Sequence, residues 1–336
     1  MILVTGGTGL VGSHLLFKLT EGNTIIRAIY RDETKLDNVK MVFSYYTDNY
    51  EERFRNIEWF KADLNNIPDL IDAFSSVNYV YHCAALVSFN TSDFELLKKI
   101  NIEGTANIVN LCVSEKIKKL CYVSSIAAIG SSTKSDLTEE TDWNPEDNHS
   151  VYALTKYGAE LEVWRGTQEG LDAVIVNPGV IIGPGFWNSG SGLFFNKIKR
   201  GMWFYTTGIT GYIGVEDVVR IMQKLMISPI NNERFILITE HLSFKDFLNK
   251  IADALDANQP KFEAKKGILT IASWLDGMKM FITKKPRTLN SSIIKTSQNK
   301  TLYNTNKFKK EFQIDLQDIS TVISKTGKLF TLFVFF

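Results

Sequence analysis

The sequence predicts an α/β fold in which helices cover both faces of a doubly wound parallel sheet, with a smaller mixed domain attached. Three observations support this prediction. Short apolar runs alternate with helix-length segments through the first half of the chain, which is typical of βαβ units. A glycine-rich turn directly follows the first apolar run. After Asn177 the pattern changes, because proline and glycine interrupt regular structure and aromatic residues become frequent.

The parallel sheet is expected to take its first strands from short apolar runs in this first half. Between residues 38 and 56 the connection is longer and more aromatic than a crossover requires, so we expect extra helix at the rim of the sheet. The expected strands are Ile2–Thr5, Thr24–Tyr30, Ile57–Ala62, Tyr79–His82, Leu120–Ser124 and Ala173–Asn177.

The second half of the chain is expected to divide between the sheet and the smaller domain. Val215–Met226 predicts a helix, because acidic residues stand in its first turn, and Arg234–Thr239 predicts a strand that returns to the sheet. Further helices are predicted at Ser243–Leu255 and Ile268–Ile282. The expected domains are residues 1–178, to which 208–240 return, and a smaller domain of residues 179–207 and 241–336.

The composition is that of an ordinary globular protein. Of 336 residues, 44% are hydrophobic and 22% charged, and the net charge of +1 gives no support for nucleic acid as a partner. No apolar run reaches the length of a membrane span, and no signal peptide is recognisable, so a cytoplasmic location is expected. The scattered Cys83, Cys112 and Cys121 predict buried thiols. The apolar tail Leu329–Phe336 predicts a terminal strand or a partner contact rather than a membrane anchor.

The glycine turn Thr5–Gly12 is typical of a Rossmann-type dinucleotide-binding domain. Gly6 would allow a tight turn at the end of the strand, and Gly9 would let the backbone approach a pyrophosphate. Gly12 would let the following helix pack closely on the sheet. The free N–H groups at the start of that helix would then face the phosphates.

A second pattern predicts acid–base chemistry. Tyr152 and Lys156 are four residues apart, so they share one face of a helix. A lysine ammonium near a phenol favours the phenolate and lowers the tyrosine pKa, which suits proton exchange with a substrate hydroxyl. Ser124 and Ser125 stand at the end of an upstream strand, at the sheet edge where ligands bind in α/β folds.

Taken together, these motifs resemble the extended short-chain dehydrogenases/reductases of the NAD-dependent epimerase/dehydratase family, and the resemblance covers nearly the whole chain. Beside the glycine turn and Tyr152–Lys156, it rests on Ala62–Leu64, His82–Ala85, Asn101–Thr105, Val123–Gly130, Asn177–Gly185 and Tyr212–Val219. It implies an enzyme with Ser125, Tyr152 and Lys156 as catalytic residues and a small-molecule substrate bound by the smaller domain. It also allows a homodimer.

The resemblance further implies how a dinucleotide would be held. Asp63 and Leu64 would contact the adenine, Ala84 and Ala85 would line the cofactor path, and Asn101 would support the site from its helix. Pro178 and Val180 would flank the nicotinamide, and Lys156 would bind the ribose beside it. The turn residues expected to bind cofactor are Gly6, Thr8, Gly9, Leu10, Val11 and Gly12.

The end of the second strand favours NADP over NAD. Arg31 stands where the first polar side chain should emerge, and Lys35 follows one turn later. Cationic groups here suit the 2′-phosphate of NADP. Reductases of the dihydroflavonol-reductase-like branch have a similar Arg-Asp pair. Asp32 remains an alternative ligand for the ribose 2′-hydroxyl of NAD.

Three functions are compatible with these residues. The first is an NADP-dependent reductase or dehydrogenase of a small, partly apolar carbonyl compound or alcohol, because the segment from Val180 to Tyr205 is rich in Phe and Trp. The second is a nucleotide-sugar epimerase with bound NAD, in which Asn177 would meet a sugar-nucleotide phosphate. The third is a non-catalytic nucleotide sensor, although relatives of that kind commonly lose the Tyr and Lys.

Neither dehydration nor a metal site is favoured. Dehydratases of this family place an acidic pair beside the catalytic hydroxyl residue, whereas Ile126 and Ala127 follow Ser125 here. The four histidines show no metal-ligand spacing, so no metal is predicted. Of these, His14 is expected on the first helix and His82 at the end of a buried strand.

Overall fold

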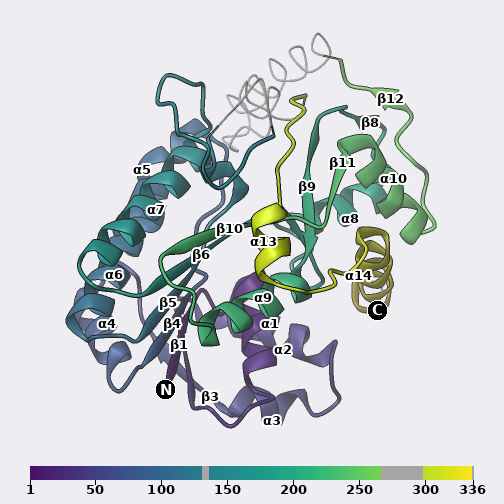
Figure 1. Ribbon diagram of the computed structural model, residues 1–336. Helices are drawn as coiled ribbons and strands as arrows, with labels where there is room; N and C mark the ends of the chain where they lie inside the picture. Colours follow the sequence, from purple (N-terminus) through teal and green to yellow (C-terminus); the bar gives the residue numbers. More distant parts are fainter. Residues whose placement is uncertain (131–135, 266–297, 335–336) are drawn as a thin grey trace.

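A seven-stranded parallel sheet forms the centre of the protein (Figure 1). The structure is a computed structural model that describes residues 1–130, 136–265 and 298–334. The strand order is β10–β6–β5–β4–β1–β2–β3, and each neighbouring pair is parallel. The strands are β1 (Ile2–Thr5), β2 (Ile26–Tyr30), β3 (Ile57–Lys61), β4 (Tyr79–His82), β5 (Lys119–Val123), β6 (Ala173–Pro178) and β10 (Glu233–Leu237).

This sheet confirms the predicted fold class, and its strands agree with the expected ones to within one or two residues at each end. The chain runs outward from β1 through β2 to β3, then crosses back to β4 on the other side of β1. The direction of winding therefore reverses between β1 and β4. In open parallel sheets, ligands bind at the carboxyl ends of the strands beside such a reversal.

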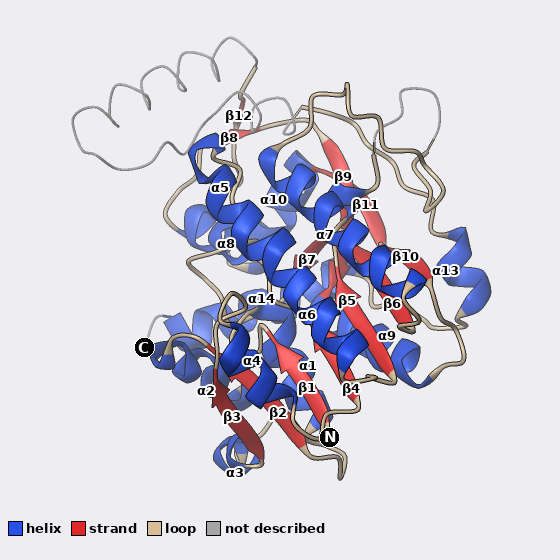
Figure 2. Cartoon of the chain, turned by 90° about the vertical axis from the view of Figure 1, so that its left-hand side faces the viewer, coloured by secondary structure: helices blue, strands red, loops and turns tan. Residues whose placement is uncertain are grey.

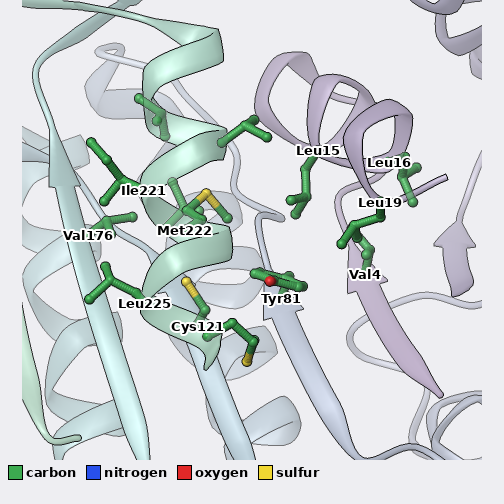
Figure 3. Close-up of a cluster of buried hydrophobic side chains, with 14 of the residues drawn as sticks. Val4, Leu15, Leu16, Leu19, Tyr81, Cys121, Val176, Ile221, Met222 and Leu225 are labelled. Carbon is green, nitrogen blue, oxygen red and sulfur yellow. The ribbon is translucent and has the colours of Figure 1, made fainter. Parts of the chain in front are cut away.

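Helices cover both faces of the sheet because each face carries its own apolar cluster. Figure 3 shows one face, where Leu15, Leu16 and Leu19 of α1 (Leu10–Leu19) and Ile221, Met222 and Leu225 of α9 (Val215–Ile227) meet the strands. The opposite face carries three helices, which stand in front of the sheet in Figure 2. They are α4 (Ile67–Phe74), α6 (Gly104–Ser114) and α7 (Val151–Gln168).

The rim helix expected between residues 38 and 56 is present as two short helices. They are α2 (Leu36–Ser44) and α3 (Tyr50–Arg55). Val39 and Phe43 of α2 are buried against α1. The aromatic residues of this segment thus pack against α1 and the core on that face of the sheet.

The smaller part of the protein has its own sheet and core. β7 (Val180–Ile182), β9 (Ile209–Gly214) and β11 (Glu240–Ser243) form a three-stranded sheet. β8 (Phe204–Tyr205) and β12 (Phe262–Glu263) form a short separate pair. Residues 208–240 are therefore divided between the two sheets: β9 lies in the smaller sheet, and β10 lies beside β6 in the main sheet. The helices of this part are α8 (Gly192–Lys199), α10 (Phe244–Ala254) and α14 (Ile319–Val334).

The apolar tail is a correction to the sequence analysis. Leu329 to Val334 belong to α14, not to a strand, and Phe330 is fully buried against Trp187, with ring centroids 5.0 Å apart. Through Phe330 this helix contributes to the core of the smaller part, whereas Leu332 and Phe333 are exposed. Within the described residues, no helix is long and apolar enough to cross a membrane. The helix predicted at Ile268–Ile282 lies outside the described residues.

Candidate active site

The glycine turn folds tightly against the loop that follows β4. Gly6 has a φ of +68°, which favours glycine, and a Cβ there would lie 2.5 Å from the backbone nitrogen of Ala84. A Cβ on Gly12 would lie 2.2 Å from the carbonyl oxygen of Gly6. The absence of a side chain at Gly12 therefore lets α1 approach the backbone of the turn. From the sequence we had expected it to let α1 approach the sheet.

The turn leaves an open cradle at the start of α1. A Cβ on Gly9 would meet only the carbonyl oxygen of Gly6, at 3.4 Å. No side chain caps this end of α1, and the first N–H groups of a helix have no partner within it. The cradle therefore fits the pyrophosphate of a dinucleotide, with Leu10 and Val11 supplying the first helical N–H groups.

A groove runs from this cradle over the carboxyl ends of the strands, with a cavity volume of about 250 Å³. The loop after β4 forms one wall and the loop after β2 the other. Of the residues predicted from the sequence to bind cofactor, nine line the groove: Gly6, Thr8, Gly9, Arg31, Lys35, Asp63, Leu64, Ala84 and Ala85.

The outer end of the groove carries exposed charges. A guanidinium nitrogen of Arg31 lies 3.7 Å from a carboxylate oxygen of Asp63, and these side chains are 62% and 38% exposed. Asp32 accepts hydrogen bonds from the backbone N–H of Thr34, at 3.1 Å, and from its hydroxyl, at 2.7 Å. These bonds hold the pKa of Asp32 below its usual value. Asp32 therefore caps the turn after β2, whereas Lys35 stays exposed at the groove.

Asn101 supports the groove from behind, as the resemblance implied. Its side-chain oxygen accepts from the backbone N–H of Leu86 at 2.8 Å, and its amide donates to the Leu86 carbonyl at 3.0 Å. The amide also donates to the Thr155 hydroxyl on α7, at 3.2 Å. Asn101 is buried, so it fixes the loop after β4 without facing the groove.

Ser125 and Tyr152 meet at the inner side of the sheet edge. Ser125 directly follows β5, and its hydroxyl accepts from the backbone N–H of Ala127 at 3.1 Å. Tyr152 lies in the first turn of α7, which Ser150 caps. Burial raises the pKa of Tyr152 to about 12, and a hydrogen bond with Ser125 opposes this rise. The two hydroxyl groups can therefore bind one substrate oxygen.

Lys156 lies on the same helix face, but its contacts differ from those predicted. Its ammonium donates to the Tyr122 hydroxyl at 2.7 Å and to the Val123 carbonyl at 2.9 Å. Burial lowers the pKa of Lys156 to about 7. The expectation that Lys156 lowers the pKa of Tyr152 is wrong for this structure, because the ammonium is bound by β5 and burial of the phenol dominates.

Tyr122 is a site residue that the sequence analysis missed, and it connects Lys156 to a buried polar chain. The Tyr122 hydroxyl hydrogen-bonds to Thr105 of α6. The Thr105 hydroxyl lies 3.0 Å from Nε2 of His82, whose Nδ1 lies 2.6 Å from the Thr5 hydroxyl. Burial lowers the pKa of His82 to about 3, so this histidine is neutral and structural.

His14 is also structural. It is buried on α1, and its Nε2 lies 3.0 Å from the Pro184 carbonyl oxygen while its Nδ1 lies 2.6 Å from the Tyr46 hydroxyl. Burial lowers the pKa of His14 to about 4. It therefore joins α1 to the loop after β7.

The aromatic segment after Asn177 divides between core and surface. Trp187 and Phe195 are buried in the smaller part, and the ring of Phe194 packs edge-on against Phe244 and Phe247. Trp203 and Phe204, by contrast, are 68% and 44% exposed. Pro178 ends β6 and Val180 begins β7, so both lie at the carboxyl edge of the main sheet, though neither lines the groove.

An apolar surface instead adjoins Tyr152 from the loop after β4. The ring of Phe89 packs edge-on against that of Tyr152, with centroids 5.5 Å apart and planes at 61°. Phe89 is 38% exposed and Val87 56% exposed. We call Val87 and Phe89 the apolar wall; Phe89 contacts the ring of Tyr152, and the sequence analysis did not identify either residue.

Comparison with known proteins shows the family of this chain. The model of the NAD dependent epimerase/dehydratase family matches residues 2–235. A putative dihydroflavonol 4-reductase of Synechocystis is 29% identical over 81% of this chain and 78% of its own length. Sterol demethylase protein B of Methylococcus capsulatus is 26% identical over 77% of this chain and 76% of its own length. Vestitone reductase of Medicago sativa is 32% identical, over 54% of this chain and 58% of its own.

Solved structures share the fold at lower identity. A UDP-glucose 4-epimerase of Thermotoga maritima, solved with UDP-glucose, is 19% identical and superposes with a TM-score of 0.77 over 99% of each chain. An enzyme of Bordetella bronchiseptica, solved with NAD and UDP, is 16% identical and superposes with a TM-score of 0.74 over 99% of this chain and 94% of its own. At such identities the likeness concerns the fold.

Proposed function

Because the chain belongs to the NAD-dependent epimerase/dehydratase family, we propose that it transfers a hydride between NADP and a carbonyl group or secondary alcohol of a small, partly apolar molecule. It is an NAD(P)-dependent oxidoreductase or epimerase of the extended short-chain dehydrogenase/reductase type. The observation that carries the finer proposal is the arrangement on one face of α7, where Tyr152 packs against the exposed ring of Phe89 and Lys156 follows one turn later, held by β5.

The proposed mechanism assigns one role to each of three residues. Tyr152 donates a proton to the carbonyl oxygen during reduction, and Ser125 hydrogen-bonds to the same oxygen. The Lys156 ammonium, held by the Tyr122 hydroxyl and the Val123 carbonyl, would bind the ribose next to the nicotinamide. The nicotinamide cofactor, when bound, supplies or accepts the hydride. A high pKa for Tyr152 suits a group that must hold its proton until transfer.

The charges at the outer end of the groove support NADP. Arg31 and Lys35 present two exposed cations there, and Asp32 is engaged by Thr34. An exposed guanidinium can bind a phosphate through paired hydrogen bonds. Because the salt bridge between Arg31 and Asp63 is long, at 3.7 Å, and exposed to water, Arg31 can exchange Asp63 for a 2′-phosphate.

Two observations support a reductase over a nucleotide-sugar epimerase. Asn177 is fully buried, and its amide donates to the Ser125 carbonyl at 3.0 Å and to the Glu160 carboxylate. It therefore has no amide hydrogen to offer a sugar-nucleotide phosphate. The apolar wall of Val87 and Phe89 also suits a hydrophobic substrate better than a sugar. Retention of Ser125, Tyr152 and Lys156 argues against a non-catalytic sensor.

All three cysteines are free thiols, which supports the proposal of a reducing, cytoplasmic location. Burial raises the pKa of Cys83 to about 12, so this thiol, although it lines the groove, is protonated at neutral pH and is not a nucleophile.

A substrate screen tests the proposal. Purified protein is mixed with NADPH or NADH and a panel of aldehydes, aromatic ketones, hydroxysteroid-type ketones and UDP-sugars. We expect NADPH oxidation with an apolar ketone and no conversion of UDP-sugars. Epimerisation of a UDP-sugar without net oxidation of added cofactor would contradict the proposal.

A further inference from the structure

We propose that Glu160 is a positioning residue that serves both Lys156 and Ser125. The proposal deepens the proposed function and rests on it for the catalytic roles of those two residues. Glu160 lies on α7 four residues after Lys156, so Tyr152, Lys156 and Glu160 occupy successive turns of one helix face. Its side chain is 1% exposed, as is that of Lys156.

Glu160 reaches Ser125 through Asn177. One oxygen of the Glu160 carboxylate accepts from the Asn177 amide, which also donates to the Ser125 carbonyl at 3.0 Å. Ser125 stands between β5 and a single helical turn, where its backbone could otherwise adjust. The Asn177 bridge therefore fixes the backbone that carries the Ser125 hydroxyl.

Glu160 is itself held by Arg234 of β10. The other carboxylate oxygen lies 3.1 Å from a guanidinium nitrogen of Arg234, which also donates to the Glu139 carbonyl. Burial raises the pKa of Glu160, and Arg234 and Asn177 oppose this rise. The ion pair with the partly buried Arg234 favours the charged form of Glu160.

Glu160 and Cys83 both favour the charged form of Lys156, and Glu160 has the larger effect. Burial raises the pKa of Cys83 to about 12 and that of Tyr122 well above its usual value, and it lowers the pKa of His82 to about 3. Tyr152 is also neutral. Glu160 favours the charged form of Lys156, against the burial that lowers the lysine's pKa to about 7.

The experiment follows the titration of Lys156 by NMR in the unliganded protein labelled with ¹³C at the lysine ε-carbon, with Lys156→Met to assign the resonance. Glu160→Gln removes the charge and keeps the shape. In Glu160→Gln we expect the titration midpoint of Lys156 to lie about one pH unit below the midpoint in the native protein. Asp217→Asn is the matched control, because Asp217 is also a buried carboxylate paired with an arginine, at 2.6 Å from Arg220. It should leave the midpoint unchanged.

Glu160→Gln leaves Arg234 without its carboxylate partner. Should this variant fail to fold, Glu160→Gln combined with Arg234→Gln is compared with Arg234→Gln alone, so that residue 234 is the same in both proteins. An unchanged Lys156 midpoint in either comparison would overturn the charge role. This measurement needs no substrate, so it decides that role even where a failed screen has disproved the proposed reaction.

Asn177→Ala tests the second role separately. It removes the bridge to Ser125 and keeps the Glu160 charge. We expect kcat to fall about ten- to a hundredfold, with the Lys156 midpoint and cofactor affinity unchanged. Full kcat in this variant would show that Glu160 does not position Ser125.

Discussion

The two ends of the site are built in different ways. The outer end, with Arg31, Lys35 and Asp63, lines the groove and consists of exposed side chains that emerge just after strands β2 and β3. The inner end, with Lys156 and Glu160, is buried outside the groove, and its partners come from β5, β6 and β10. In the proposed function, cofactor selection takes place at the exposed end, where one substitution changes one contact. The proposed reacting groups adjoin a buried network, where one substitution affects several contacts.

This difference predicts unequal consequences of mutation. At the exposed end, an ion pair contributes little to stability because water screens it, so variants there should fold normally. At the buried end, removing a partner leaves a polar group without its hydrogen bond, which costs stability as well as activity. The variants below test that contrast.

The largest effect is expected for Tyr152→Phe. It removes the proposed proton donor and keeps the ring that packs on Phe89. Loss of one general acid should lower kcat about 10² to 10⁴-fold. NADPH affinity, measured by calorimetry, should be unchanged. Tyr157→Phe, on the same helix and stacked on Trp143, is the matched control and should retain turnover. Equal turnover in Tyr152→Phe and the native protein would remove Tyr152 from the mechanism.

The glycine turn offers a paired test, because two of its glycines differ in what surrounds them. Gly12→Ala would place a methyl group 2.2 Å from the Gly6 carbonyl, and we expect it to destabilise the fold by about 3 kcal/mol or more. Gly9→Ala would direct its methyl group into the groove, so the fold should survive while NADPH binding weakens. Thermal unfolding and calorimetry measure the two effects. Normal NADPH affinity in folded Gly9→Ala would contradict the phosphate cradle.

A smaller effect is expected at the outer end. Arg31→Ala removes the proposed partner of the 2′-phosphate and should weaken NADPH binding about tenfold, the lower end for a charge-assisted bond because the site is exposed. NADH binding should change little. Arg55→Ala removes a similarly exposed ion pair with Glu51, on α3, and should alter neither affinity. Equal losses for NADPH and NADH in Arg31→Ala would argue against NADP selectivity.

The same contrast explains what the sequence could predict. The glycine turn, Arg31 and the Tyr152–Lys156 pair are local patterns, and the parallel sheet follows from alternating strands and helices. The sequence also held a signal for Glu160, since it continues the i, i+4 spacing of Tyr152 and Lys156. A buried glutamate on a helix face packed against a sheet requires a partner.

Other features depend on tertiary packing that spacing does not encode. The pairing of β4 with β5 and the packing of α6 bring Tyr122 to Lys156 and Thr105 to His82. The aromatic residues after Asn177 gave an ambiguous signal, because composition does not separate core rings such as Trp187 from exposed rings such as Trp203. For the apolar tail we expected a terminal strand or a partner contact, because a segment with Thr331 as its one polar residue reveals no helical period.

Transfer of deuterium from NADPH labelled at the reactive C4 position tests the central claim most directly. The native protein is incubated with the labelled cofactor and the ketone found in the screen, and the product is analysed by mass spectrometry. A reductase predicts one deuterium in the product for each labelled cofactor oxidised, and no transfer above background with Tyr152→Phe. An isomerised product that carries no deuterium would contradict the account, since an epimerase returns the hydride to its substrate from a cofactor that stays bound.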